Sequence, residues 1–227
     1  MSMKRMIGRL AIAMAAAGMM TAALADTTIA YITNGNTNEG WTLINGGAKK
    51  AGQKPGVKFI ELAAKKSELS KQLAIVEDMI TRKVNAIAIA PVDSKGIAPA
   101  INKALAAGIK VVAVDTGITG AAITSYVATD NIKAAMVQGN WAAEQVKDGD
   151  TVIYITGDLG QSTGQERKKG FLDGLNAKRK NVKVVEVPTT WDQTMAQNGV
   201  ETALRANPTA KVIACAWDGG ALGAKAA

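Results

Sequence analysis

The sequence contains no histidine, only one cysteine and few aromatic residues. Without histidine, the chain lacks the commonest general base, the usual partner of a nucleophile and the commonest metal ligand. Cys215 has no partner for an internal disulfide bond, and within the apolar run 212–216 it is expected to be a small buried side chain. These absences argue against most hydrolases and metalloenzymes, and no cofactor or metal is expected.

The glycine clusters at 117–120 and 157–164 match neither the dinucleotide-binding pattern G-x-G-x-x-G nor the phosphate-binding pattern G-x-x-x-x-G-K-[ST]. We interpret them as loops, and we expect neither a G-x-S-x-G pattern nor a nucleophile elbow of the α/β-hydrolase kind. A secreted α/β enzyme that processes sugars, with Asp93 and Asp115 as an acid–base pair, remains the alternative from another functional class.

Residues 1–25 have the features of a secretory signal peptide. Three basic residues precede an apolar run, 10–24, that closes on Ala23-Leu24-Ala25, an A-x-A cleavage site. The run is shorter than the roughly 20 apolar residues that span a bilayer. We therefore expect cleavage after Ala25 and a protein in the periplasm, with an uncleaved N-terminal anchor as the alternative.

The positive charge of the chain is mild once the leader is removed. Taking its three basic residues from the 27 Lys and Arg leaves 24, against 19 Asp and Glu, so the net charge falls from +8 to +5. The basic residues are scattered and have no aromatic residues between them, which is typical of a solvated surface. No nucleic-acid partner is expected.

Short apolar runs alternate with amphipathic segments from residue 27 onward. The spacing of Leu and Ile predicts a helix over 67–82, with Ser67 in its N-cap region. Continuous apolar strands separated by helices indicate a parallel sheet covered on both faces, so the predicted class is α/β. Strands are predicted at 28–33, 57–62, 86–90, 111–115, 124–127, 152–156, 182–187 and 212–216.

Internal similarity predicts two lobes, each a parallel sheet flanked by helices. The sequence of the run 87–93 is similar to that of the run 212–218, and each run is followed by a predicted helix of small residues. A second βα series begins after Ala128-Thr129-Asp130-Asn131. We therefore expect a first lobe over 26–129 and a second over 130–227.

Polar and aromatic residues follow the predicted strands, where ligands gather in parallel sheets. Three of the 4 tryptophans lie in such loops. Indole faces pack on the CH face of a sugar ring, while carboxylates, amides and a guanidinium bind its hydroxyls. The candidate ligand-binding residues are Asn34, Asn38, Trp41, Asp93, Asp115, Arg167, Trp191, Trp217 and Asp218.

Each candidate also has a structural interpretation. The three aspartates are typical helix N-caps, the two asparagines are typical turn formers, and the loop tryptophans can cover apolar surface. Arg167 can pair with a helix carboxylate. Trp141 lies within a predicted helix and is expected in the core.

Several motifs occur in the order found in one family: the run 28–32, Asp115 after the run 111–114, the run 129–131, Glu166-Arg167-x-x-Gly170-Phe171, and the run 218–224. The chain resembles periplasmic sugar-binding proteins of the ribose-binding type, the substrate receptors of ABC importers, over the whole mature sequence. The resemblance implies the type I periplasmic binding fold and a monomer that binds a sugar or polyol between its lobes, without catalysis, and docks on an inner-membrane permease. A relative that serves chemotaxis or a sensor kinase would use the same site.

The resemblance also implies roles for single residues. Asp115 would bind hydroxyls, Arg167 would clamp the sugar from the second lobe, and Trp191 would stack on its ring. We expect Asp115 and Arg167 to face each other across the cleft, without strong partners inside their own lobes. The hinge would include Asp130 and Asn131. The first-lobe wall would be formed by Asn34, Asn38 and Trp41.

Two positions depart from the ribose-binding pattern. Ala90 and Trp217 stand where those proteins carry asparagine. A buried ligand hydroxyl without a partner would cost roughly 1–3 kcal/mol, so ribose is disfavoured relative to another pentose, a hexose, a deoxysugar or a polyol. The chain also ends within a predicted helix, and the resemblance implies a further strand and return crossovers, so a C-terminally incomplete second lobe is expected.

Overall fold

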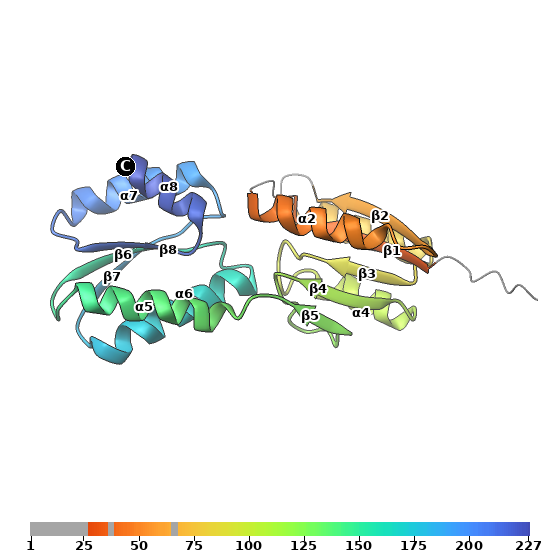
Figure 1. Cartoon of the computed structure of the whole chain (residues 1–227), viewed down its shortest axis with the longest axis horizontal. Helices are drawn as coiled ribbons and strands as arrows, with labels where there is room; N and C mark the ends of the chain where they lie inside the picture. The colour runs from red at the N-terminus through yellow and green to blue at the C-terminus, as the bar shows by residue number, and fades with distance from the viewer. Residues whose placement is uncertain (1–26, 36–38, 65–67) are drawn as a thin grey trace, which may run out of the picture.

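The structure is a computed structural model that describes residues 27–35, 39–64 and 68–227. Within these residues the chain forms two lobes, each a parallel sheet with helices against it (Figure 1). No helix in the described ranges is long and apolar enough to cross a membrane. The signal peptide with its cleavage site, Asn38 and the N-cap role of Ser67 lie outside the described residues.

The first lobe contains a five-stranded sheet in the order β2-β1-β3-β4-β5, and all its strand pairs are parallel. The chain passes outward from β1 to β2 and then returns to the other side of β1, which creates a topological switch point beside β1. Its strands are β1 (Thr27–Thr33), β2 (Val57–Ala63), β3 (Ala86–Ile89), β4 (Lys110–Val114) and β5 (Ser125–Val127). Its helices are α2 (Glu39–Gly52), α3 (Leu69–Thr81) and α4 (Ala98–Ala106).

Alternate residues of β1 face opposite sides of this sheet, as the period of two requires. Ala30 and Ile32 are fully buried in the cluster that α3 and α4 complete. Tyr31, between them, faces α2, and its hydroxyl donates a 2.8 Å hydrogen bond to Asn45 Oδ1. The first sheet is therefore covered on both faces, which explains its continuous apolar strands.

The second lobe contains a three-stranded parallel sheet in the order β7-β6-β8, which repeats the arrangement around β1. Helices α5 and α6 cover one face, and α7 and α8 cover the other (Figure 1). The strands are β6 (Thr151–Ile155), β7 (Lys183–Val187) and β8 (Val212–Cys215). The helices are α5 (Asn131–Gln145), α6 (Ser162–Lys178), α7 (Gln193–Ala206) and α8 (Asp218–Ala226).

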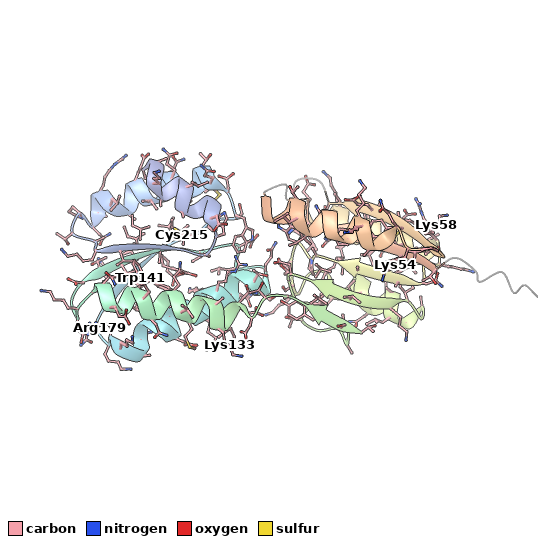
Figure 2. The ribbon with its side chains drawn as sticks, in the orientation of Figure 1. Lys54, Lys58, Lys133, Trp141, Arg179 and Cys215 are labelled. Carbon is pink, nitrogen blue, oxygen red and sulfur yellow. The ribbon has the colours of Figure 1, made fainter. Side chains whose placement is uncertain are left out.

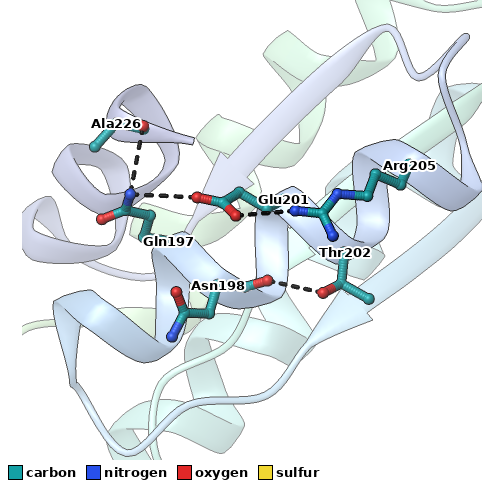
Figure 3. Close-up of polar contacts among 6 residues, drawn as sticks. All are labelled: Gln197, Asn198, Glu201, Thr202, Arg205 and Ala226. Atoms are coloured by element: carbon teal, nitrogen blue, oxygen red, sulfur yellow. Dashed lines mark hydrogen bonds and ion pairs between the residues drawn. The ribbon is translucent and has the colours of Figure 1, made fainter.

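Figure 3 shows polar contacts along α7, one of which joins it to α8. Gln197 Nε2 donates to Glu201 Oε1 at 3.3 Å and to the carbonyl oxygen of Ala226 at 3.5 Å. Arg205 Nη2 donates to the other Glu201 oxygen at 3.2 Å. These contacts lie on the outer surface of the lobe and leave the inner faces of both helices apolar.

Helices α5 and α6 approach each other closely because glycines lie at their contact. A Cβ atom at Gly174 would lie 2.3 Å from the carbonyl oxygen of Met136. On the sheet side of the same pair, the Phe171 ring stacks on Tyr154 with ring centroids 4.3 Å apart. The backbones of the two helices therefore touch where larger side chains would hold them apart.

The expectation that Trp141 belongs to the core is wrong. Trp141 lies on α5 (Figure 2), and its side chain is 55% exposed. The buried stripe of this helix is made of Ala135, Gly139, Ala142 and Ala143, and Trp141 falls outside it. Cys215 is half-buried at the end of β8, and burial raises the pKa of its thiol to about 11.

All eight predicted strands are confirmed, with each end within one residue of the prediction. The α/β class and the two lobes are confirmed as well. The chain leaves the first sheet at Val127 and begins α5 at Asn131. The division at 129/130 stays a prediction.

Candidate functional site

Loops at the carboxyl ends of the two sheets enclose a cavity of about 560 Å³ between the lobes. Eight of its described lining residues were not predicted from the sequence, among them Gln161, Thr163 and Gln193. Seven predicted residues line it: Asn34, Trp41, Asp115, Arg167, Trp191, Trp217 and Asp218.

The first lobe contributes residues that follow β1 and β4. Asn34 and Trp41 are buried, at 1% and 7% exposure. Asp115 adopts the left-handed backbone conformation, with φ of 62°, which is uncommon for a residue other than glycine and often marks a functional site. Burial raises the pKa of its carboxyl, while a 3.1 Å hydrogen bond from Thr116 Oγ1 and the nearby Arg167 charge act in the opposite direction.

The second lobe contributes Arg167 from α6. Its Nε donates to Asn131 Oδ1 at 2.9 Å, and its Nη1 donates to the carbonyl oxygen of Ala216 at 2.8 Å. The prediction that Arg167 lacks strong partners inside its own lobe is therefore wrong. The same contacts fix the guanidinium at the cavity wall, where its central carbon lies 5.7 Å from the centroid of the Trp191 ring.

Trp191 and Trp217 form an aromatic corner at the cavity. Their ring centroids are 5.4 Å apart and their planes meet at 85°. Trp191 follows β7 with a φ of 63°, so its backbone also occupies the left-handed region. Its indole lies across Gly157, where a Cβ atom would stand 2.0 Å from the ring carbon Cη2. Glycine at 157 therefore makes room for the ring.

Asp93 requires a correction, because it is not among the described residues that line the cavity. Its Oδ1 accepts hydrogen bonds from the backbone N–H groups of Lys95 at 2.9 Å and Gly96 at 2.6 Å. These bonds stabilise the turn that follows β3, whereas the N-cap residue of α4 is Ile97, so the interpretation of Asp93 as a helix N-cap is also wrong. Asp218, in contrast, is the first residue of α8 and lies exposed at the cavity.

The two lobes also meet directly at the beginning of α6. Ser94 N–H donates to the carbonyl oxygen of Gly160 at 3.0 Å, and Ser162 N–H donates to Ser94 Oγ at 2.9 Å. Gly117 N–H donates to Ser162 Oγ at 2.8 Å. Thr163 Oγ1 donates to the carbonyl oxygen of Asp115 at 3.2 Å. One edge of the cavity is thus closed by hydrogen bonds between the lobes.

The run Gly160-Gln161-Ser162-Thr163-Gly164 does spell the G-x-S-x-G pattern, which corrects the expectation that none occurs. A nucleophilic serine needs an adjacent base, and the sequence contains no histidine. Ser162 Oγ is instead engaged by Gly117 of the opposite lobe. In this chain, residues of the pattern form hydrogen bonds between the lobes.

The proposed hinge residues lie at the start of α5. The Asp130 carboxylate caps the helix by accepting from Lys133 N–H at 3.1 Å, and its pKa is lowered, chiefly by the side chain of Lys133. Asn131 is buried and donates through Nδ2 to Glu166 Oε2 at 3.1 Å, while its Oδ1 accepts from Arg167. The crossing between the lobes is therefore tied to the arginine at the cavity.

Comparison with known proteins identifies the family. The periplasmic binding protein domain family matches residues 29–227. The chain belongs to this family. The ribose import binding protein of Salmonella typhimurium is 29% identical over 224 residues, which cover 99% of this chain and 75% of that protein.

Solved structures agree with this assignment. An ABC transporter solute-binding protein from Burkholderia graminis, in complex with D-arabinose, is 31% identical with a TM-score of 0.79, and the match covers 87% of this chain and 68% of that one. The Caulobacter myo-inositol binding protein, bound to myo-inositol, is 26% identical with a TM-score of 0.81, and the match covers 91% and 71%. The resemblance to periplasmic sugar-binding proteins and the type I fold are thus confirmed, and the family is one of binding proteins.

Proposed function

We propose that this protein binds a monosaccharide or polyol in the cavity between its lobes, in the periplasm, and delivers it to the inner-membrane permease of an ABC importer. The observation that carries the proposal is the composition of the cavity wall. A carboxylate from the first lobe, a guanidinium from the second and an aromatic corner line one space.

These groups suit a ligand with many hydroxyls on an apolar ring. The Asp115 carboxylate can accept from hydroxyls, the Arg167 guanidinium can donate to them, and the indole of Trp191 offers a flat face to ring CH groups. The cavity of about 560 Å³ also falls within the usual range for small-molecule sites. Hydrogen bonds from a sugar to Asp115 would stabilise its buried charged form.

The cavity wall also favours some sugars and polyols over ribose. Trp217 places a large apolar surface where the ribose-binding pattern has an amide, so one hydrogen-bonding group is missing there. A pentose other than ribose, a hexose, a deoxysugar or a polyol fits this wall better, because no ligand hydroxyl then needs the missing amide. The relatives that hold D-arabinose and myo-inositol support this choice of ligand class.

Delivery would depend on closure of the lobes. A ligand shifts a protein toward the closed form only by binding that form more tightly than the open one. A sugar held by Asp115 and Arg167 would meet this condition, because the two residues come from different lobes. The permease would then recognise the closed form, as in hinge closure around ligands generally.

A thermal-shift screen of monosaccharides and polyols tests the proposal. A ligand at a hundredfold excess over its Kd adds about 2.7 kcal/mol to stability, which corresponds to roughly 5–10 °C for a chain of this size. We expect at least one sugar or polyol to raise the melting temperature this far. Failure of the whole panel would contradict the proposal, and NMR detection of a sugar product would favour the enzyme instead.

A further inference from the structure

Gln161 stands at the start of α6 but does not cap this helix with its side chain. It is the N-cap residue of α6, yet its side chain makes no capping hydrogen bond. Serine, threonine, asparagine and aspartate are the residues that favour this position. The Gln161 side chain is nevertheless buried, at 3% exposure, at the edge of the cavity. Its amide must therefore be satisfied elsewhere.

The nitrogen and the oxygen of the Gln161 side-chain amide form hydrogen bonds with different lobes. Nε2 donates to the carbonyl oxygen of Val92, in the first lobe, at 3.1 Å. Oε1 accepts from the indole Nε1–H of Trp191, in the second lobe, at 2.9 Å. Because one end donates and the other accepts, the amide has a single orientation that satisfies both bonds. A glutamine side chain thus connects the first lobe to the indole at the cavity.

The acceptor on the first lobe is itself held in place. Val92 N–H donates to Oε1 of Gln72, a fully buried residue of α3, at 2.9 Å. The Nε2 group of Gln72 donates to the carbonyl oxygen of Ala90 at 2.9 Å. The backbone around Val92 is therefore fixed to the first lobe before it meets Gln161.

Among the residues that the structure describes, Gln161 is the one that accepts a hydrogen bond from the Trp191 indole. Gly157 lies beneath the ring, Trp217 meets it at an edge and Arg167 lies over its face. These contacts are made with carbon atoms or with the π face, and they do not direct the N–H group. The hydrogen bond from Nε1 to Gln161 is directional and fixes the direction of the N–H group.

We propose that Gln161 is a positioning residue that converts contact between the lobes into alignment of the Trp191 indole at the cavity wall. When Gln161 reaches Val92, its amide is oriented and the indole N–H has a fixed acceptor. Without that contact the amide is free to rotate, and the indole loses its fixed acceptor. The contribution of Trp191 to sugar binding then depends on closure. This inference rests on the proposed function.

The test compares wild type with Gln161→Met, which keeps the length of the side chain and removes both hydrogen bonds. The first readout needs no ligand: the indole ¹H–¹⁵N NMR signal of Trp191, assigned with Trp191→Phe. In Gln161→Met we expect this signal to move and its hydrogen exchange to accelerate. Gln197→Met, which makes the same change at a glutamine of α7 whose hydrogen bonds lie within the second lobe, is the matched control and should leave the signal in place.

The second readout is affinity for the sugar that gives the largest thermal shift. Gln161→Met should bind it about tenfold more weakly, and the loss should be clearly smaller when Trp191→Phe is already present. An equal loss in both backgrounds would show that Gln161 acts on the sugar directly and would overturn the inference. An unmoved indole signal in Gln161→Met would also overturn it. If no sugar binds wild type, the proposed function fails, and the ligand-free signal alone decides the role of Gln161.

Discussion

Replacement of Gly157 by alanine should weaken sugar binding by displacing Trp191. A Cβ atom at 157 would stand 2.0 Å from Cη2 and 2.2 Å from Cζ3 of the indole. Carbon atoms in contact are usually about 3.5–4.0 Å apart, so the ring must move by roughly 1.5 Å. The φ of Gly157 lies outside the left-handed region, so alanine adds no backbone strain of its own.

The size of the effect follows from the contacts that the ring would lose. A displaced indole loses its proposed stacking contact with the sugar, while the loss of its contacts with Trp217 and Arg167 lowers the stability of the fold and frees the ring from its aligned position. Aromatic and cation–π contacts contribute about 0.5–1.5 kcal/mol each. We expect a loss of about 1–2 kcal/mol in binding free energy, or roughly 5- to 30-fold in Kd.

Isothermal titration calorimetry measures this loss, and tryptophan fluorescence reports whether the ring has moved. Gly46→Ala, on α2, is the control because no heavy atom lies within 4 Å of its added Cβ. That variant should bind as wild type does and be stabilised by up to about 1 kcal/mol. Wild-type affinity and unchanged fluorescence in Gly157→Ala would refute the placement of the indole.

Three further predictions concern stability and are measured by urea unfolding. Burial raises the pKa of Asp115, so its contribution to stability is complete below the unfolded pKa of about 3.9 and is lost as pH rises through the folded value. Asp115→Asn should therefore become more stable relative to wild type from acid toward neutral pH; a constant difference would contradict the assigned environment. Gly174→Ala should lower the free energy of unfolding by about 1–3 kcal/mol, because its Cβ would lie 2.3 Å from the carbonyl oxygen of Met136. Unchanged stability would mean that α5 and α6 lie further apart. Trp141→Gln should lower the free energy of unfolding by less than about 1 kcal/mol, since the side chain is 55% exposed. Phe171→Ala, at 0% exposure, should lower it by about 3–5 kcal/mol. Equal losses would mean that Trp141 is buried after all.

The fold could be predicted from local patterns because strand and helix periods are properties of short segments. Each apolar run became a strand, and the carboxyl ends of parallel strands share an edge, so residues after them meet. This reasoning placed Asp115, Trp191 and Trp217 at one cavity.

Properties that depend on neighbours distant in sequence could not be predicted. Asp93 follows a strand as Asp115 does, but its carboxylate is taken by the turn that follows it. The outward direction of Trp141 follows from the small residues with which α5 meets α6. The roles of Gln161 and Gly157 depend on Trp191, about 30 residues further along the chain, and the only local signal is their place in a glycine-rich loop after β6.

The most direct test of the central claim is calorimetric titration of wild type, Asp115→Ala and Arg167→Ala with the sugar that gives the largest thermal shift. Hydrogen bonds to charged groups contribute about 1.5–3 kcal/mol, so each variant should bind about 10- to 150-fold more weakly. Arg205→Ala, which removes an exposed arginine of α7 that pairs with Glu201, is the control and should bind as wild type does. Wild-type affinity in both cavity variants would contradict a sugar site between the lobes.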